Sequence, residues 1–350
     1  MPLTTTCIGA YPKPGFIRLP DWFNIPAGPD TADPTKQWAA ALQAMGPEAE
    51  AIIEQGVAQV LADQIEAGID IPTDGEVPRE NYIHYHCRHI QGFDFQNLTN
   101  KSLRNGAYSA NLPTITGPVS ARQPFLHLDY QRAQRHSDRP VKITLPGPMT
   151  ITDSNANEYY DDPAVLGRDL ADALNREVLN LAEAGCQYIQ IDEPLFARKP
   201  QAALDYGFAN LERAFRNCPV HVVKTVHMCC GYPDRLDHPN YPKADQNAYF
   251  EIADAIDASC IDAVSLEDAH RPNPLELLDR FKNTTVIFGV VAIAKSRVES
   301  VQEVRERLTL ALKHIDAEQL IAAPDCGLGL LGRDLAREKL RVLCEAAEQI

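Results

Sequence analysis

Short apolar segments alternate with helical patterns along nearly the whole of this 350-residue chain. The apolar segments lie at Thr5–Ala10, Ile69–Gly75, Val141–Leu145, Tyr188–Ile191, Val222–Met228, Ile261–Leu266, Thr285–Val291 and Leu320–Ala323. Apolar residues recur at helical spacing over Ala49–Ala67, Ala164–Ala184, Asn247–Ala258, Leu275–Phe281, Val298–His314 and Arg333–Gln349. Strands that alternate with helices form parallel βα units, and about eight such units close a barrel. We therefore predict an α/β fold, a TIM (β/α)8 barrel.

Two long segments, about 11–47 and 82–139, do not follow the alternation. The first is rich in proline, aspartate and aromatic residues, and the second has a predicted short strand over Leu112–Gly117. Both follow predicted strands, so we expect long loop excursions at the C-terminal face of the barrel, as lids or pocket walls. The chain has no repeat or linker pattern. We therefore predict one domain over residues 1–350.

The charge of the chain excludes several classes of protein. Asp and Glu number 48 against 33 Lys and Arg, a formal net charge of -15. Nucleic acids and anionic membranes need a basic surface, so we expect no nucleic-acid partner and no membrane partner. No apolar run reaches the roughly 20 residues of a membrane span, and the N-terminal sequence does not read as a secretory signal. Nine cysteines, an odd number, indicate reduced thiols, and we expect a cytoplasmic protein.

Polar side chains gather where the predicted strands end. The strand ends carry Asp74–Glu76, Asp192–Pro194, His227–Cys230, Glu267–Asp268, Lys295–Arg297 and Asp325–Gly327. Polar groups that interrupt buried strands cost free energy unless they have a role there. Since barrel enzymes bind substrate at the C-terminal ends of the strands, we predict an active site at this mouth.

One set of these residues has the chemistry of a zinc site. His227 and Cys229 are two residues apart on a predicted strand, so their side chains share a face, whereas Cys230 points away. Glu267 and Cys326 end two later strands. One nitrogen, two sulfur and one oxygen ligand suit tetrahedral zinc. The alternative is that His227 and Cys229 are core residues and Glu267 a surface carboxylate.

Several segments together resemble a known family. Tyr188–Pro194, His227–Gly231, Val264–Glu267 and Pro324–Gly329 are similar to the catalytic barrel of cobalamin-independent methionine synthases. Thr4–Pro14 resembles the first strand of that barrel, and the resemblance runs in order over nearly the whole chain. It implies a catalytic barrel with zinc held by His227, Cys229, Glu267 and Cys326. It also implies a methyltransferase that methylates the thiol of homocysteine to form methionine.

Homocysteine would need contacts for each of its groups. Zinc removes the proton of a bound thiol, whose pKa is otherwise near 8.5, and Glu267 is the ligand we expect to yield to it. The ammonium group needs carboxylates and the carboxylate needs hydrogen-bond donors. The expected substrate contacts are Glu76, Asp192, Glu193 and the backbone of Ile8, Gly9 and Ala10. For Asp192 and Glu193 the alternative is a hydrogen-bonded cap on the next segment.

The chain departs from the folate-dependent enzymes in three ways. They resemble two fused barrels, whereas this chain has the length of one. Ala292-Ile293-Ala294 stands where they have Asp-Ile-His, whose His donates a proton, and Ala10 replaces a Ser. These differences leave the zinc half intact and leave the methyl donor open, either a folate or a corrinoid carrier protein.

Lys295 is the candidate catalytic residue at the seventh strand. With Arg297, it would contact an anionic donor or thiol. The alternative is that both are solvated residues at the start of a helix.

Three other functions stay open from the sequence. The first keeps the zinc and changes the electrophile, as in epoxyalkane:coenzyme M transferases. The second is a metal-free lyase resembling uroporphyrinogen decarboxylase. The third is a thiol-binding protein that has lost its donor site. His84, His86 and His89 also invite interpretation as a second metal site, but an aromatic and titratable pocket wall is the favoured interpretation.

Overall fold

A seven-stranded parallel sheet forms the centre of the protein, which is described by a computed structural model over residues 2–24, 33–103, 108–239 and 241–350. The order in the sheet is β1-β10-β9-β8-β7-β6-β4, and all of its ladders are parallel. Its strands are β1 (Thr4–Thr5), β4 (Lys142–Pro146), β6 (Tyr188–Asp192), β7 (Val223–Met228), β8 (Ala263–Glu267), β9 (Thr285–Val291) and β10 (Leu320–Pro324). The predicted α/β class with a parallel sheet is confirmed. The predicted closed eight-stranded barrel is not, because among the described residues the regular ladders join seven strands and leave β1 and β4 as edges.

The segment Ile69–Gly75, predicted as the second strand, is not a regular strand. Its Ile71 N–H donates to the carbonyl of Thr5 over 3.0 Å, and its Pro72 carbonyl accepts from the N–H of Lys142 over 2.8 Å. The segment thus makes isolated parallel bridges to both edge strands, β1 and β4. Proline has no N–H, so a continuous ladder through this segment cannot form.

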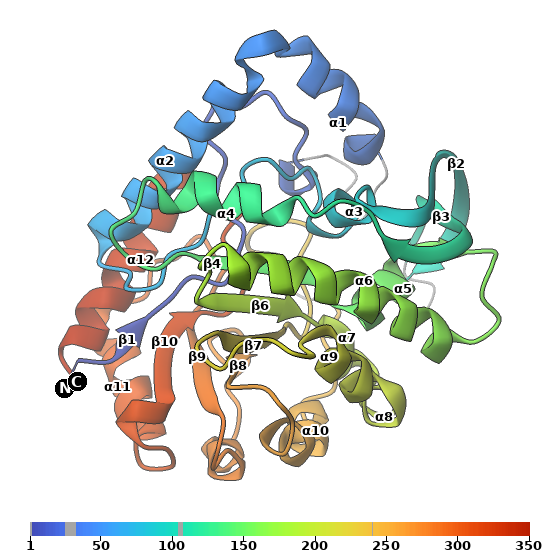
Figure 1. Cartoon of the computed structure of the whole chain (residues 1–350). Coiled ribbons are helices and arrows are strands. Elements are labelled where there is room, and N and C mark those ends of the chain that lie inside the picture. Colours follow the sequence, from blue (N-terminus) through green and yellow to red (C-terminus); the bar gives the residue numbers. More distant parts are fainter. Residues whose placement is uncertain (1, 25–32, 104–107, 240) are drawn as a thin grey trace.

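Helices cover the outer side of the sheet (Figure 1). Those that follow the sheet strands are α2 (Ala49–Ala67), α5 (Pro148–Ser154), α6 (Pro163–Glu183), α7 (Pro194–Arg198), α8 (Pro200–Ala202), α9 (Phe208–Ala214), α10 (Ala248–Asp257), α11 (Val301–Ala311) and α12 (Arg333–Glu348). A π-helical turn, Ala203–Gly207, joins α8 to α9. Short 3₁₀ turns lie at Trp22–Asn24, Gly46–Glu48, Leu275–Arg280 and Ala317–Gln319. The third of these takes the place of the α-helix expected over Leu275–Phe281.

The two excursions form a second layer over one part of the sheet. The first contains α1 (Asp33–Ala44), and the second contains α3 (Tyr82–Cys87), a hairpin of β2 (Ile90–Leu103) and β3 (Tyr108–Ala121), and α4 (Leu126–Gln134). β5 (Ala156–Asn157) adds a parallel strand to β3. The strand expected over Leu112–Gly117 is part of β3. Residues 25–32 and 104–107 of the predicted excursions lie outside the described residues.

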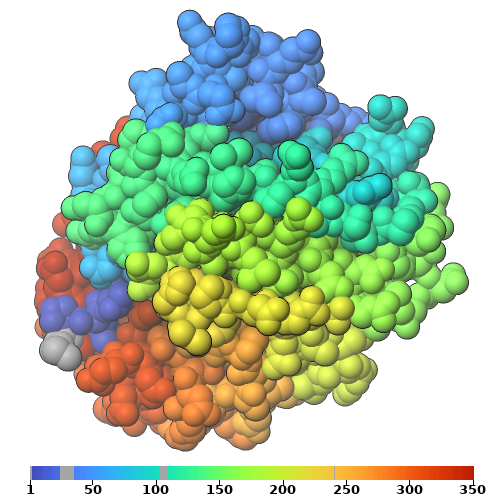
Figure 2. Space-filling model, in the orientation of Figure 1, coloured from blue at the N-terminus to red at the C-terminus, as the bar shows by residue number. Residues whose placement is uncertain are grey.

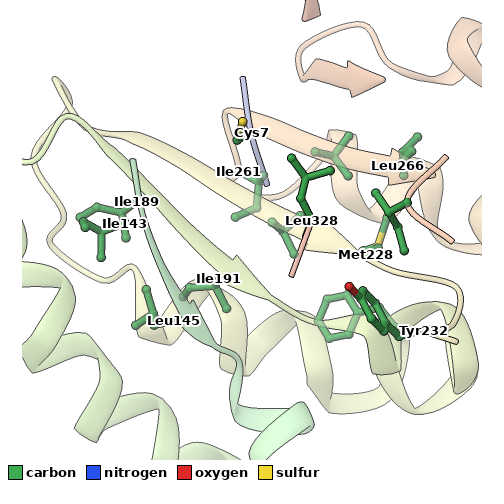
Figure 3. Packing of buried hydrophobic residues seen from close by; sticks show 14 of the residues in the cluster. Cys7, Ile143, Leu145, Ile189, Ile191, Met228, Tyr232, Ile261, Leu266 and Leu328 are labelled. Atoms are coloured by element: carbon green, nitrogen blue, oxygen red, sulfur yellow. The ribbon is translucent and has the colours of Figure 1, made fainter. Parts of the chain in front are cut away.

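The main core lies between the sheet and its helices. Along β4 and β6, Ile143 lies beside Ile189 and Leu145 beside Ile191, all fully buried (Figure 3). Residues at the alternate positions face the opposite side of the sheet. There a separate small apolar cluster contains Ile8, Ala263, Ile287 and Ala323. On this same face, the polar groups described below lie at the carboxyl ends of the strands.

The N-terminal segment of the described chain lies beside the C-terminal helix. The N–H of Leu3 donates to the carbonyl of Ala347, which ties the start of the chain to α12 (Figure 1). In the space-filling view the N-terminal helices, α4 with the hairpin, and the later βα units pack as successive bands down one face (Figure 2). None of the described helices has the length and apolar character needed to cross a bilayer.

A buried ion pair fixes the segment after β9. The Lys339 ammonium on α12 donates to the Glu299 carboxylate over 2.8 Å and to the carbonyl of Arg297 over 2.6 Å. Glu299 also accepts the N–H of Ala292 over 3.1 Å. The side chains of Lys339 and Glu299 are 0% and 5% exposed. Removing one partner of such a pair leaves a buried charge without compensation.

We therefore expect Lys339→Met to lower the free energy of unfolding by about 3 kcal/mol. Arg280→Met breaks the exposed pair with Asp254 and serves as the control, with an expected loss below about 1 kcal/mol. Urea unfolding followed by circular dichroism measures both. Equal losses in the two variants would contradict this account of the buried pair.

Candidate active site

A pocket opens at the carboxyl ends of the strands, with an empty volume of about 990 Å³ that includes space open to solvent. Its walls combine charged, metal-ligating and aromatic groups. The lining residues include Ile8, Gly9, Ala10, Trp22, Phe23, Glu76, His84, Asp192, Arg198, His227, Cys229, Tyr232 and Cys326. Of the eleven residues that the sequence assigned to the site, eight line this pocket. Glu193, Glu267 and Lys295 do not.

Three ligand-type side chains meet in this pocket. The candidate ligand atoms of His227, Cys229 and Cys326 all lie within 4.8 Å of one another. His227 and Cys229 come from the end of β7, and Cys326 follows β10. Cys230 instead packs in the apolar core, where burial raises the pKa of its thiol to about 12. Strand parity thus separates the two adjacent cysteines.

The environment of this cluster keeps its groups in their neutral forms. Burial lowers the pKa of His227 to about 3. Its Nε2 lies 3.3 Å from the Cys326 sulfur, and its Nδ1 lies 2.9 Å from the Ser265 hydroxyl. A hydrogen bond with the Cys326 thiol, together with burial, raises the pKa of Cys229. Two thiols and an imidazole in contact form a set that a divalent cation would convert to thiolate ligands.

Glu267 lies beside this cluster but is not part of it. Its Oε2 accepts a hydrogen bond from the Lys243 ammonium over 3.1 Å, and the two side chains are 5% and 14% exposed. The group of three ligand atoms does not include Glu267. The structure therefore places the fourth predicted ligand in an ion pair at the edge of the pocket.

Two buried carboxylates form another part of the pocket. Burial and the charge of Glu76 raise the pKa of Asp192 well above its ordinary value, and burial also raises the pKa of Glu76. The side-chain amide of Gln190 donates to Asp192 over 2.8 Å, and the Thr144 hydroxyl donates to Glu76 over 2.7 Å. Two mutually repelling carboxylates that line a pocket are suited to a cationic ligand group.

The backbone turns sharply to bring Glu76 into the pocket. Gly75 and Glu76 both have positive φ, +66° and +57°. A Cβ on Gly75 would lie 2.4 Å from a methyl group of Val60, so the turn requires glycine there. For glutamate this conformation is strained, and such strain occurs where function positions a side chain.

The first strand supplies backbone groups to the same pocket. The segment of Ile8, Gly9 and Ala10 lines it, and a Cβ on Gly9 would lie 2.8 Å from the Glu76 carboxylate. Within the described residues, the N–H groups of Gly9 and Ala10 have no hydrogen-bond acceptor. They can therefore donate to an anionic ligand group next to the carboxylates.

Comparison with known proteins identifies the family. Residues 25–349 match the family described as the catalytic domain of cobalamin-independent synthase. The chain belongs to this family. It is 30% identical to the methionine synthase of Saccharolobus solfataricus over 354 residues, covering 99% of this chain and 95% of that protein. The methionine synthase of Sulfolobus acidocaldarius is 27% identical over 341 residues, covering 97% and 89%.

Solved structures agree with this family. A B12-independent methionine synthase from Shewanella sp. W3-18-1, in complex with selenomethionine, superposes with a TM-score of 0.86 at 30% identity. The match covers 100% of this chain and 98% of that one. A putative B12-independent methionine synthase from Listeria monocytogenes has a TM-score of 0.73 at 19% identity, covering 99% and 98%, which supports the fold alone.

Glu193, an expected substrate contact, has another role in this synthase-family chain. Its two carboxylate oxygens accept the N–H groups of Met149 and Thr150, both over 2.9 Å, and the Thr150 hydroxyl over 2.7 Å. Glu193 is fully buried, and burial raises its pKa to about 7. It therefore anchors the N-terminus of α5. The alternative from the sequence was a cap on the next segment, whereas the helix that Glu193 caps precedes it in the chain.

The structure does not support Lys295 as a catalytic residue. Lys295 is exposed and does not line the pocket. The next residue, Ser296, bonds through its N–H and hydroxyl to Asp237, which holds the segment at the surface. Arg297 forms an exposed pair with Glu303. The alternative of solvated residues before a helix describes both side chains.

Both excursions contribute aromatic residues to the pocket wall, as expected, whereas the sequence did not reveal Tyr232 and Arg198. Trp22, Phe23, Tyr82 and Tyr232 pack in one aromatic cluster that lines the pocket. Arg198, at the end of α7, lines it as well. The aromatic residues come from three distant segments, so no spacing signal joins them. Arg198 lies six residues after Asp192, within one strand-to-helix unit, and that proximity was the available signal.

The three histidines after Asn81 belong to the pocket wall and the core beneath it. Burial lowers the pKa of His84 to about 4, that of His89 to about 4, and that of His86 well below its ordinary value. His84 Nδ1 lies 2.7 Å from the Thr35 hydroxyl, and the His89 ring stacks on Phe125. Among the described residues these histidines form no metal-binding group.

The carboxylate pair predicts a pH-dependent effect on stability. Because the pKa of Asp192 is higher in the folded protein than in the unfolded chain, its ionisation opposes folding. Stability therefore falls as pH rises through the folded pKa. We expect Asp192→Asn to raise the free energy of unfolding of the ligand-free protein at pH 8 by about 1 kcal/mol.

The gain should disappear near pH 4, where the aspartate is protonated in the folded protein. Urea unfolding at both pH values tests this, with the exposed Asp161→Asn as the control. A loss of stability at pH 8 would contradict it.

Proposed function

We propose that this protein transfers a methyl group to the thiol of homocysteine and forms methionine at a zinc centre in the pocket. The observation that carries the proposal is the shared pocket itself. It holds the His227, Cys229 and Cys326 side chains together with the Glu76 and Asp192 carboxylates. A relative solved with selenomethionine, an analogue of the product, supports the same ligand class. The methionine synthase relatives favour this function over epoxide transfer or a lyase.

The residues present fit zinc. One imidazole and two thiols supply a nitrogen and two sulfur ligands, and we assign the fourth position to Glu267 when no thiol is bound. The Ser265 hydroxyl contacts Nδ1 of His227 and orients the ring, so Nε2 is left as the ligand atom. When bound, zinc supplies a thiolate at neutral pH by lowering the pKa of a thiol ligand.

The protein binds the rest of the amino acid. We assign Glu76 and Asp192 to the ammonium group, which removes their mutual repulsion on binding. The free N–H groups of Gly9 and Ala10 receive the carboxylate, so the absent serine hydroxyl at position 10 is partly replaced by backbone. Held at both ends, the thiol is fixed relative to the methyl group that it attacks.

We assign the methyl donor to the aromatic wall and Arg198. Trp22, Phe23 and Tyr232 offer flat apolar surface, and Arg198 adds a positive charge near Cys229. Both candidate donors, a folate and a corrinoid on a carrier protein, carry anionic groups that suit this wall. Ala294 stands where the resemblance implies a proton-donating His, and its N–H donates to the Nε2 of His270 over 2.9 Å.

We further infer that the segment Ile69–Gly75, which makes isolated bridges to the β1 and β4 sides of the sheet, takes the place of the predicted second strand. The whole chain 1–350 then acts as one catalytic domain. The S. solfataricus methionine synthase, matched over 95% of its length, supports a single unit of this size.

The zinc assignment is tested by metal content and homocysteine binding in the same preparation. We expect about one zinc per chain in the wild type and in Cys230→Ala, and loss of zinc in Cys326→Ala. Calorimetry in buffers of different ionisation enthalpy should show about one proton released for each homocysteine bound. Cys230 is the matched control because it neighbours a ligand but lies in the core.

Zinc retained by Cys326→Ala, or no zinc in wild type purified without chelator, would overturn the assignment. Methionine formation from 5-methyltetrahydrofolate or from methylcobalamin then separates the two donors. Tight homocysteine binding without methionine from either donor would indicate the thiol-binding protein that lacks a donor.

A further inference from the structure

The ion pair between Lys243 and Glu267 sits at the rim of the ligand cluster. Its atoms are 3.1 Å apart, and little of either side chain is exposed. The Lys243 ammonium also lies 4.9 Å from the ring centre of Tyr241. Among the described residues, this is the ion pair that Glu267 makes. A buried carboxylate with one cationic partner depends strongly on that partner.

Sheet register brings Glu267 within reach of the cluster. Met228 pairs with Leu266 between β7 and β8, so Cys229 and Glu267 are the next residues along the two strands, at one level. His227 pairs with Ser265 two residues before, and their side chains are in hydrogen-bond contact. Adjacent strands are about 4.8 Å apart. The Glu267 carboxylate can therefore turn either toward the cluster or toward Lys243 without a backbone movement.

The position of Lys243 is fixed by its own segment. The N–H of Ala244 donates to the carbonyl of Cys230 over 2.8 Å. Arg271, which follows β8, donates to the carbonyl of Ala244 over 2.7 Å. These bonds tie the chain around Lys243 to the ends of both β7 and β8. The ammonium therefore stays at the rim whichever way Glu267 turns.

We propose that Lys243 is a positioning residue that receives the Glu267 carboxylate when the substrate thiol takes the fourth ligand position. This proposal rests on the proposed zinc-dependent function and deepens it. As the thiolate binds, the bond between Glu267 and the metal breaks, and the thiol proton goes to solvent. The Glu267 carboxylate then pairs with Lys243 instead of remaining buried and unpaired.

The charges explain why the exchange is easy. One anionic ligand, the carboxylate, leaves the metal as another, the thiolate, arrives. The departing carboxylate meets a cation already in place. Without Lys243, the carboxylate would be released near Asp325 and Cys229, whose pKa values the charge of Glu267 already raises. Lys243 therefore weakens the hold of Glu267 on the metal and favours the thiol.

The first experiment measures Zn²⁺ affinity by chelator competition, without homocysteine. Lys243→Met frees Glu267 to remain on the metal, so we expect about tenfold tighter Zn²⁺ binding than in wild type. Lys243→Arg keeps the cation and should bind as wild type does. Lys224→Met is the matched control, since it breaks the pair with Asp262 at the other end of the same two strands.

A double variant separates the proposal from a simple loss of positive charge. In a Glu267→Gln background, Lys243→Met should not change Zn²⁺ affinity, because the carboxylate that Lys243 receives is gone. Tightening that persists in this background would show a through-space effect and overturn the proposal. Unchanged or weaker Zn²⁺ binding in the single variant would overturn it as well.

The second experiment measures homocysteine binding to the zinc-loaded proteins by calorimetry. We expect about tenfold weaker binding in Lys243→Met and wild-type binding in Lys243→Arg. Equal affinity in wild type and Lys243→Met would overturn the proposal. The failure of the proposed function looks different, since wild type would then bind no zinc or no homocysteine at all.

Discussion

The parallel register of β6, β7 and β8 brings buried polar side chains together at the carboxyl ends of the strands. Asp192 pairs with His227, and His227 pairs with Ser265, so the ends of three strands present their polar side chains at one level. The neighbouring alternate positions fill an apolar core, as with Ile143, Ile189 and Ile191 (Figure 3). A shift of one residue would exchange these two faces. The register therefore decides both the core and the pocket.

The pocket is costly for the ligand-free protein. The buried carboxylates with raised pKa values and the strained backbone of Glu76 oppose folding. In the proposed function an ammonium group would compensate the carboxylates, and a metal cation would bind the two thiols. Sites that depart from local stability rules in this way are expected where function requires them.

Much of this arrangement could be predicted from the sequence because it follows the period of the strands. Parity distinguishes Cys229 from Cys230, and the alternation of strands with helices predicts the sheet. The predictions that failed concern side chains whose hydrogen-bond partners are distant in the chain. Glu193 is taken by the N-terminus of α5, and Lys295 is held at the surface through Ser296 and Asp237. Neither contact leaves a pattern in sequence spacing.

The ion-pair partner of Glu267 is the clearest example of a contact that sequence spacing does not predict. Position at a strand end predicts a ligand, and register does place Glu267 level with Cys229. The ammonium of Lys243 comes from the irregular segment after β7, whose path no periodicity describes. The same holds for Tyr232, which joins the aromatic pocket wall from that segment.

The central claim is that substrate sulfur joins a metal held by one histidine and two cysteines. Zinc X-ray absorption spectroscopy of the purified protein, with and without homocysteine, counts the sulfur ligands directly. The account predicts two sulfur ligands with two nitrogen or oxygen ligands in the free protein, and three sulfur ligands when homocysteine is bound. An unchanged sulfur count on homocysteine binding, or four sulfur ligands in the free protein, would contradict it.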